Sequence, residues 1–170
     1  MAGDSEQISD ALNTPSSSYL RPFIVLAVET GMRRGELLSA TWKDVNLEAR
    51  TLKVSRTKNG HPRTVPLSPV AAKTLAGMDR ISDRIFPVTA NAVRLAWQRA
   101  RMRAGLSGLR FHDLRHEAGS RLFEAGLSVP EVAMVSGHRT PAMLFRYTHP
   151  KAEAIAEKLA RAAAGEVSQG

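Results

Sequence analysis

Residues 112–116 read HDLRH, which gathers two histidines and an arginine in one short stretch. At about 100° per residue, a helix that begins here presents His112, Arg115 and His116 on one inward, mostly apolar face. Burial of an uncompensated charge costs several kcal/mol, so we expect an anion beside this basic triplet. The carboxylate of Glu36, in a buried ion pair, and a phosphate group each meet this requirement.

The composition of the chain favours a nucleic acid as the molecule that supplies this phosphate. The chain has 170 residues, 43% of them hydrophobic, which is enough for one compact core. Its formal net charge is +8, and arginine, which can bind phosphate oxygens with two parallel hydrogen bonds, supplies most of the excess. We expect DNA or RNA as the partner, with a basic protein that binds neither as the alternative.

Other classes of protein fit the sequence poorly. Cysteine is absent, which excludes disulfides and cysteine-ligated zinc. No stretch approaches the roughly 18 apolar residues that span a bilayer, and the first residues do not resemble a signal peptide. We expect a soluble, cytoplasmic protein that associates with the nucleoid.

The pattern along the chain predicts an α+β fold, mainly α-helical with a small antiparallel β-sheet. Residues 1–18 are polar and indicate a flexible linker, residues 19–165 form the domain, and residues 166–170 form a flexible tail. Pro22 in the first turn and Gly31 at the end delimit the first helix. Helices are expected at residues 20–30, 35–40, 69–77, 89–104, 112–125, 129–135, 140–146 and 151–164.

A β-hairpin is predicted between the second and third of these helices. Trp42 begins a more extended stretch, and Leu52 and Val54 then alternate with polar residues. The sequence Asn-Gly at residues 59–60, followed by RTVPL at residues 63–67, is a strong hairpin signal. The prolines in the second strand favour the edge of the sheet, and Lys58 lies at the tip of the hairpin.

A second arginine is available to join Arg115 at a phosphate. Arg33 follows the first helix in the stretch TGMRRGE, where a glycine-rich turn can aim it inward, and Glu36 lies one helical turn later. Two guanidinium groups on one phosphate would neutralise the charge that builds up in a pentacoordinate transition state. Arg33 alone is also compatible with an ordinary surface arginine, so the hypothesis depends on the whole set.

The remaining residues can supply the other parts of a transesterification. The phenol of Tyr147 becomes a better nucleophile where nearby cations favour the phenolate. Lys58 can protonate a leaving oxygen, while His112 and His138 can donate to the phosphate or move protons. Taken singly, a tyrosine such as Tyr147 is more often a half-buried packing residue, and a lysine such as Lys58 is more often a solvated turn residue.

Four motifs in order carry a family resemblance. The stretches TGMRRGELLSATWKDV, TKNGHPRTVPL, FHDLRHEAGSRLFEAG and VSGHRTPAMLFRYTH resemble the catalytic domain of the tyrosine recombinases, the phage integrase group, from about residue 20 to about residue 160. The resemblance implies site-specific DNA recombination through a 3′-phosphotyrosyl intermediate, on double-stranded DNA and without a metal or cofactor. It places the catalytic residues at Arg33, Lys58, His112, Arg115, His138 and Tyr147.

The resemblance also assigns supporting roles and reveals departures. Glu36 falls on the position of a supporting acid, and His116 is interpreted as a structural neighbour of the site. Ser136 stands where a leucine is usual before Gly-His, and Glu117 where a threonine is common. Members usually carry a further amino-terminal DNA-binding domain, so we expect this chain to be a catalytic fragment.

The segment at residues 151–164 implies an oligomer by the same resemblance. In relatives such a helix packs on a neighbouring subunit of a tetramer assembled on DNA; packing on its own domain, in a monomer, is the alternative. Candidates for the DNA-facing surface come from one arginine-rich helix, although some of them are equally compatible with a solvated face. These candidates are Arg94, Arg99, Arg101 and Arg103.

Three rival functions remain to be separated. The i,i+4 spacing of His112 and His116 is also found among zinc ligands, but Asp113 stands where a metalloprotease has its glutamate. A DNA-binding module without catalysis would share the basic surface. A type IB topoisomerase would share the chemistry and relax supercoils without exchanging strands.

Overall fold

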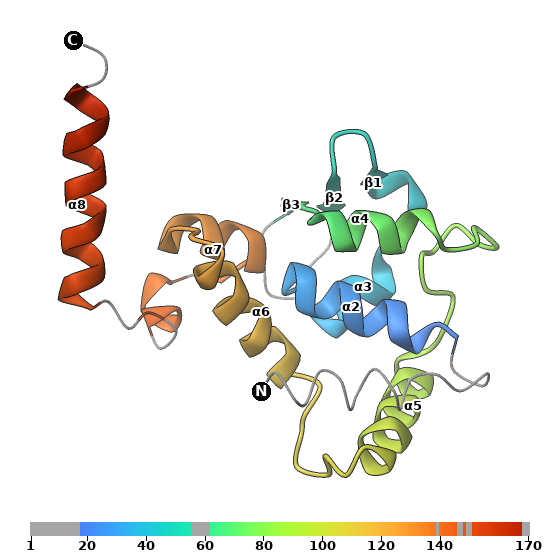
Figure 1. The fold of residues 1–170 in the computed structure, drawn as a ribbon. Helices are drawn as coiled ribbons and strands as arrows, with labels where there is room; N and C mark the ends of the chain where they lie inside the picture. Colours follow the sequence, from blue (N-terminus) through green and yellow to red (C-terminus); the bar gives the residue numbers. More distant parts are fainter. Residues whose placement is uncertain (1–17, 56–61, 139, 146–147, 149–150, 168–170) are drawn as a thin grey trace.

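The computed structural model describes residues 18–55, 62–138, 140–145, 148 and 151–167. Helices dominate this part of the chain and a small antiparallel sheet lies at one edge of them (Figure 1), which confirms the predicted fold class. The helices are α2 (Leu20–Thr30), α3 (Arg34–Ser39), α4 (Pro69–Ala76), α5 (Ala90–Arg103), α6 (Asp113–Glu124), α7 (Val129–Ser136) and α8 (Ala152–Val167), with 3-10 turns η2 (Trp42–Asp44) and η3 (Pro141–Met143).

The sheet contains β1 (Val45–Asn46), β2 (Thr51–Val54) and β3 (Arg63–Pro66) in that order, and both pairs are antiparallel. Strand β3 forms an edge, as its prolines predicted, and it pairs with β2 in the register that joins Val54 to Arg63. The residues that connect these two strands, Lys58 among them, lie outside the described part of the chain. The expected extended stretch begins at Val45 rather than Trp42, because Trp42 starts the 3-10 turn η2.

Helix α2 is the centre of the core. Leu20, Phe23 and Leu26 have no exposed surface, and the helix packs against both α4 and α6. It ends where the sequence predicted, because Gly31 adopts the left-handed conformation with φ of 63° and donates its backbone N–H to Ala27. Burial of α2 on several sides explains why its sequence is apolar nearly all round.

An aromatic cluster fixes the loop that leads into α6. The ring of Phe23 lies 4.8 Å from that of Phe86 and 5.6 Å from that of Phe111, measured between centroids. Phe111 also meets Trp97 of α5 edge to face at 5.6 Å. Phe111 immediately precedes the HDLRH stretch, so this packing anchors the start of α6 on the core.

The predicted α-helix at residues 140–146 was wrong. In the described part of this segment, residues 140–145, the structure has the 3-10 turn η3, in which the N–H of Met143 donates to the carbonyl of Thr140 at 3.1 Å. An i→i+3 hydrogen bond closes a tighter turn than an α-helix, and the segment is held to the body by Leu144, which is fully buried.

Helix α8 stands apart from the rest of the fold in Figure 1. Two of its apolar side chains, Ile155 and Leu159, are 48% and 66% exposed. Neither α8 nor any other helix in the described residues is long and apolar enough to cross a membrane.

Candidate active site

The turn after α2 sets the position of Arg33. Thr30 donates its hydroxyl to the carbonyl of Leu26 and accepts the backbone N–H of Met32 at 3.2 Å, so the chain leaves the helix in a fixed direction. A Cβ on Gly31 would lie 3.5 Å from the Cβ atoms of both Ala118 and Ser136. The turn is therefore wedged between α6, which carries Arg115, and α7, which leads to His138.

Glu36 holds Arg33 from the first turn of α3. Its Oε2 accepts the backbone N–H of Arg33 at 2.9 Å, and its Oε1 accepts Nη1 of the same arginine at 3.2 Å. The Arg33 side chain is 43% exposed, whereas that of Glu36 is 4% exposed. Glu36 thus orients the base of an arginine whose side chain still reaches solvent.

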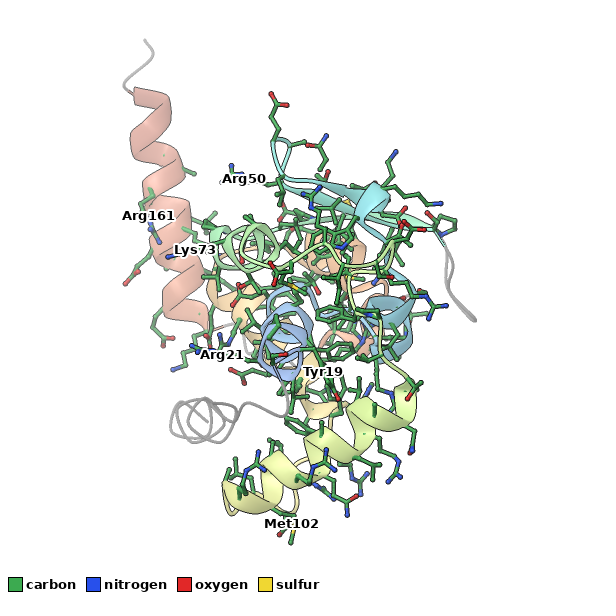
Figure 2. All side chains as sticks on the ribbon, turned by 90° about the vertical axis from the view of Figure 1, so that its right-hand side faces the viewer. Tyr19, Arg21, Arg50, Lys73, Met102 and Arg161 are labelled. Atoms are coloured by element: carbon green, nitrogen blue, oxygen red, sulfur yellow. The ribbon has the colours of Figure 1, made fainter. Side chains whose placement is uncertain are left out.

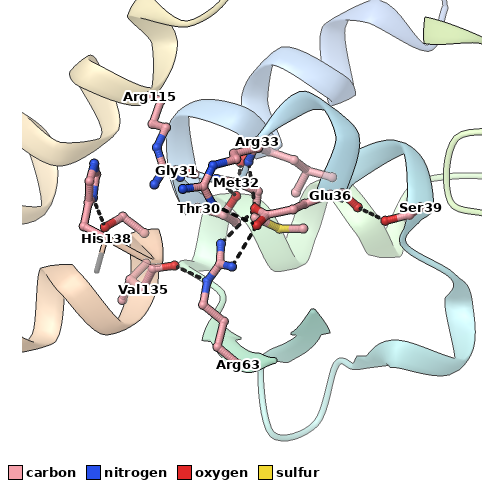
Figure 3. Close-up of polar contacts among 12 residues, drawn as sticks. Thr30, Gly31, Met32, Arg33, Glu36, Ser39, Arg63, Arg115, Val135 and His138 are labelled. Atoms are coloured by element: carbon pink, nitrogen blue, oxygen red, sulfur yellow. Dashed lines mark hydrogen bonds and ion pairs between the residues drawn. The ribbon is translucent and has the colours of Figure 1, made fainter. Parts of the chain in front are cut away.

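A third arginine, Arg63 of β3, was missed by the sequence analysis. Its Nη1 and Nη2 lie 2.9 Å from Oε1 and Oε2 of Glu36, and its Nε donates to the carbonyl of Val135 at 3.1 Å (Figure 3). The side chain is 9% exposed. The strand alternation contained the signal, because Arg63 shares the inward face of β3 with the buried Val65.

The close fit around Arg63 depends on a glycine. Gly137 ends α7 in the left-handed conformation with φ of 70°. A Cβ at this position would lie 2.8 Å from Cζ and Nη1 of Arg63, closer than van der Waals contact allows. Gly137 therefore satisfies two requirements at once, the backbone turn and the approach of the guanidinium.

The surroundings of Glu36 keep it ionised. Burial would by itself raise the pKa of this carboxyl, but the hydrogen bond from Arg63 and the backbone N–H of Arg33 oppose it. Together with the positive charges of both arginines, they hold the pKa of Glu36 below 4.5. The carboxylate therefore carries its negative charge between two guanidinium groups.

The expected inward basic triplet on α6 was only partly correct. Arg115 is buried, 6% exposed, and donates Nη1 to the carbonyl of Gly31. His112 is exposed and His116 half-buried, with their rings edge to face at 4.9 Å. Helix α6 packs on both α2 and α7, and this contact buries the stripe Leu114, Arg115, Ala118 and Gly119.

The alternative in which Glu36 neutralises Arg115 is also wrong. Both carboxylate oxygens of Glu36 bind Arg63, and one of them also binds the side chain of Arg33. Arg115 instead projects from α6 to the Gly31 turn, where it contacts a backbone carbonyl (Figure 3). Glu36 does form a buried ion pair, but its partner is Arg63 of β3 and not Arg115 of the HDLRH stretch.

Three of the expected catalytic residues share one cleft. Arg33, His112 and Arg115 line a depression of about 380 Å³ between the α2–α3 turn and the start of α6. His138 is joined to the same region through Ser136, which lies against Gly31. Lys58 and Tyr147 lie outside the described residues. Within the described ranges, no three His, Asp or Glu residues lie close enough together to hold a metal ion.

The fold and the cleft together define the catalytic domain of a tyrosine recombinase. The chain belongs to the phage integrase family, which it matches over residues 2–154. It is similar to the shufflon-specific DNA recombinase of Escherichia coli, with 46% identity over 136 residues that cover 79% of this chain and 35% of that protein.

Solved structures share the architecture. A lambda integrase dimer bound to a COC′ core site has a TM-score of 0.71 at 27% identity, covering 89% of this chain and 59% of that one. The Tn1549 transposon integrase in complex with circular intermediate DNA has a TM-score of 0.74 at 20% identity, which shows the fold alone; 94% of this chain and 65% of that one are covered. The chain spans about a third of the length of two of the curated relatives that it matches, 35% and 33%.

Proposed function

We propose that this chain cleaves and rejoins double-stranded DNA at specific sites, as the catalytic part of a recombinase of the phage integrase family. The observation that carries the proposal is the cleft in which Arg33, Arg115 and His112 meet. Two guanidinium groups and an imidazole at one depression suit the oxygens of a phosphodiester and the charge that grows on them during displacement at phosphorus.

Each residue of the site then has a defined part in the reaction. Arg33 and Arg115 bind the non-bridging oxygens, and His112 and His138 donate to the same phosphate. The phenol of Tyr147 gives its proton to solvent and its oxygen attacks phosphorus, while the bond to the 5′ oxygen breaks and the Lys58 ammonium gives a proton to the leaving oxygen. The product is a 3′-phosphotyrosyl bond, and attack on it by a 5′ hydroxyl rejoins a strand and releases Tyr147.

Glu36 and His116 support this chemistry from behind the cleft. Glu36 orients Arg33 through two hydrogen bonds, while Arg63 supplies the second positive charge that balances the carboxylate. His116 packs edge to face on His112 and so limits its orientation. The reaction as written balances without a metal ion or cofactor, and we expect it to proceed at full rate in EDTA.

DNA binding would use the exposed face of α5 as well as the cleft. Arg94, Arg99 and Arg103 are exposed there, and Figure 2 shows how the side chains of this helix extend away from the core. Arg101 is instead held by the carbonyls of Ser107 and Leu109, at 2.8 and 3.1 Å. Such a protein would associate with the nucleoid.

We further propose that α8 joins subunits into a tetramer on DNA. Ile155 and Leu159 are one helical turn apart and largely exposed, on a helix that stands away from the body (Figure 1). Residues 19–165 would form the catalytic domain in this arrangement, flanked by a linker at residues 1–18 and a tail at residues 166–170. Without DNA, the domain can remain a monomer.

A nicked suicide duplex tests the proposed chemistry. Strand cleavage on such a substrate releases a short fragment, so the covalent protein–DNA adduct accumulates and is visible by denaturing electrophoresis. We expect the adduct with the parent protein in EDTA and none with Tyr147→Phe. The chain contains two tyrosines, and Tyr19→Phe is the matched control that should form the adduct normally.

The other outcomes identify the rival functions. DNA binding without an adduct in either the parent or Tyr19→Phe would show a binding module and contradict the proposal. Loss of the adduct on chelation would contradict the metal-free reaction. An adduct combined with relaxation of supercoiled DNA, but without exchange between two sites, would show a type IB topoisomerase.

A further inference from the structure

The end of α7 holds a buried serine against a histidine of the site. Ser136 is the last residue of the helix and is 1% exposed. Its Oγ lies 2.6 Å from the carbonyl oxygen of Val132 and 2.6 Å from Nδ1 of His138. Gly137 turns the chain between the two residues.

The hydrogen bonds of Ser136 determine where the proton of His138 lies. A hydroxyl has one hydrogen, and a carbonyl oxygen can only accept. The Ser136 hydroxyl therefore donates to Val132, and the short contact with His138 is attractive only if Nδ1 carries a hydrogen and donates it to Oγ. With an unprotonated Nδ1, two acceptors would compete for the one hydrogen of a buried hydroxyl, each 2.6 Å from it.

We propose that Ser136 is a positioning residue that fixes the Nδ1–H tautomer of His138, so that His138 can donate to the scissile phosphate only as the imidazolium. In the neutral Nδ1–H form, Nε2 presents a lone pair, which repels phosphate oxygens. In the cation, Nε2 carries a hydrogen and donates it to the anion. Engagement of the phosphate by His138 is then coupled to uptake of one proton.

The residue that the resemblance leads one to expect would not impose this coupling. A leucine at position 136 has no oxygen, so Nδ1 could lose its hydrogen and the neutral Nε2–H tautomer could donate to the phosphate. The serine in this chain thus makes the site sensitive to protonation through a side chain that does not itself touch DNA. The predicted effect on DNA cleavage rests on the proposed function, whereas the predicted tautomer of His138 does not depend on it.

The described titratable and charged groups near His138 come from the elements packed on α7. The elements packed on α7 contribute Arg115 and the half-buried His116 from α6, and Arg63, paired with Glu36, from β3. The turn η3 carries no titratable side chain. Arginine stays charged at all accessible pH values, and the lowered pKa of Glu36 keeps this carboxylate ionised near neutral pH. His116 is therefore the one group of this described set, besides His138, whose protonation must be followed separately.

Nitrogen-15 NMR of the imidazole rings tests the tautomer directly. The chain has 5 histidines, and the signals of His138 are assigned by their loss in His138→Gln. At a pH above its titration midpoint, we expect His138 of the parent to carry its hydrogen on Nδ1 and that of Ser136→Ala to shift toward Nε2. Nε2–H as the main neutral form in the parent would overturn the inference.

Cleavage of the suicide duplex between pH 6 and 9 tests the consequence. The two proteins differ only at position 136, so the ratio of the parent rate to the Ser136→Ala rate cancels the pH effects that they share. We expect this ratio to fall with rising pH, by at most about tenfold per pH unit for one coupled proton. A ratio that does not change with pH would overturn the coupling.

A matched control separates this effect from the loss of a helix hydroxyl. Thr74 of α4 also donates its hydroxyl to the carbonyl four residues earlier, Val70, at 2.8 Å. Thr74→Ala should leave both the His138 tautomer and the pH dependence unchanged. If no variant forms an adduct, the proposed function fails, while the NMR result still decides the tautomer.

Discussion

Arg63 and Glu36 form a bidentate ion pair in which Nη1 and Nη2 of the arginine each lie 2.9 Å from a carboxylate oxygen. The pair links three elements, because Glu36 also binds Arg33 before α3 and Arg63 also binds the carbonyl of Val135 in α7. The buried pair thereby holds both Arg33, which lines the cleft, and the end of α7, which leads to His138. A compensated Glu36 also leaves the positive charge of Arg33 available for a phosphate.

Removal of Arg63 should therefore destabilise the protein strongly. In Arg63→Met the ionised Glu36 remains buried with only its contacts to Arg33, and breaking a buried pair in this way costs about 3–5 kcal/mol. We expect a loss of this order in the free energy of unfolding, measured by urea denaturation. The adduct yield on a suicide duplex should fall as well, since the carboxylate then competes for Arg33.

A double-mutant cycle separates the pair from its parts. Glu36→Gln added to Arg63→Met removes the unpaired charge, so the double variant should be more stable than the sum of the two single losses implies. Strict additivity of the unfolding free energies would show that the two side chains do not stabilise each other.

The sequence predicted the elements of the fold better than the contacts between them. Gly31, Pro22 and the strand alternation act within a few residues, and the helix end and the edge strand they predicted are present. The partner of Glu36 could not be found in the same way, since Arg63 lies 27 residues along the chain. Likewise, a helical wheel shows which residues share a face of α6, but the packing of α2 and α7 decided that Arg115 is buried and His112 exposed.

The fit of Gly137 against Arg63 can be tested with a control of the same backbone conformation. Gly105 has φ of 71°, and a Cβ there would have open space within 4 Å. Alanine at a left-handed position costs about 1–2 kcal/mol from the backbone alone, and Gly105→Ala should show only that loss. Gly137→Ala must also displace the guanidinium of Arg63, so its unfolding free energy should fall by at least about 1 kcal/mol more. Equal losses in the two variants would contradict a tight contact with Arg63.

The low pKa of Glu36 predicts a loss of stability in acid. A carboxyl with a folded-state pKa below its usual 4.5 stabilises the fold above that value, and the contribution disappears as the pH falls through the folded pKa. We expect the stability difference between the parent and Glu36→Gln to be constant near neutral pH and to shrink below about pH 4.5. Urea denaturation at a series of pH values measures it, and a difference that persists unchanged at pH 3 would show that Glu36 is not ionised in the fold.

Two arginines on α5 should differ in their effect on DNA binding, although they are only two residues apart. Arg99 is exposed, whereas Nη1 of Arg101 donates to the carbonyls of Ser107 and Leu109. If α5 faces DNA, Arg99→Gln removes a phosphate contact and lowers the slope of log K against log salt by about 0.9, the share of one phosphate contact. Arg101→Gln should leave the slope unchanged and instead reduce stability, because it releases the loop that follows α5.

Fluorescence anisotropy with a labelled duplex at several salt concentrations gives both slopes. Equal slopes for the parent and Arg99→Gln would remove Arg99 from the DNA-facing surface, and a smaller slope for Arg101→Gln would mean that DNA binding frees its side chain from the two carbonyls.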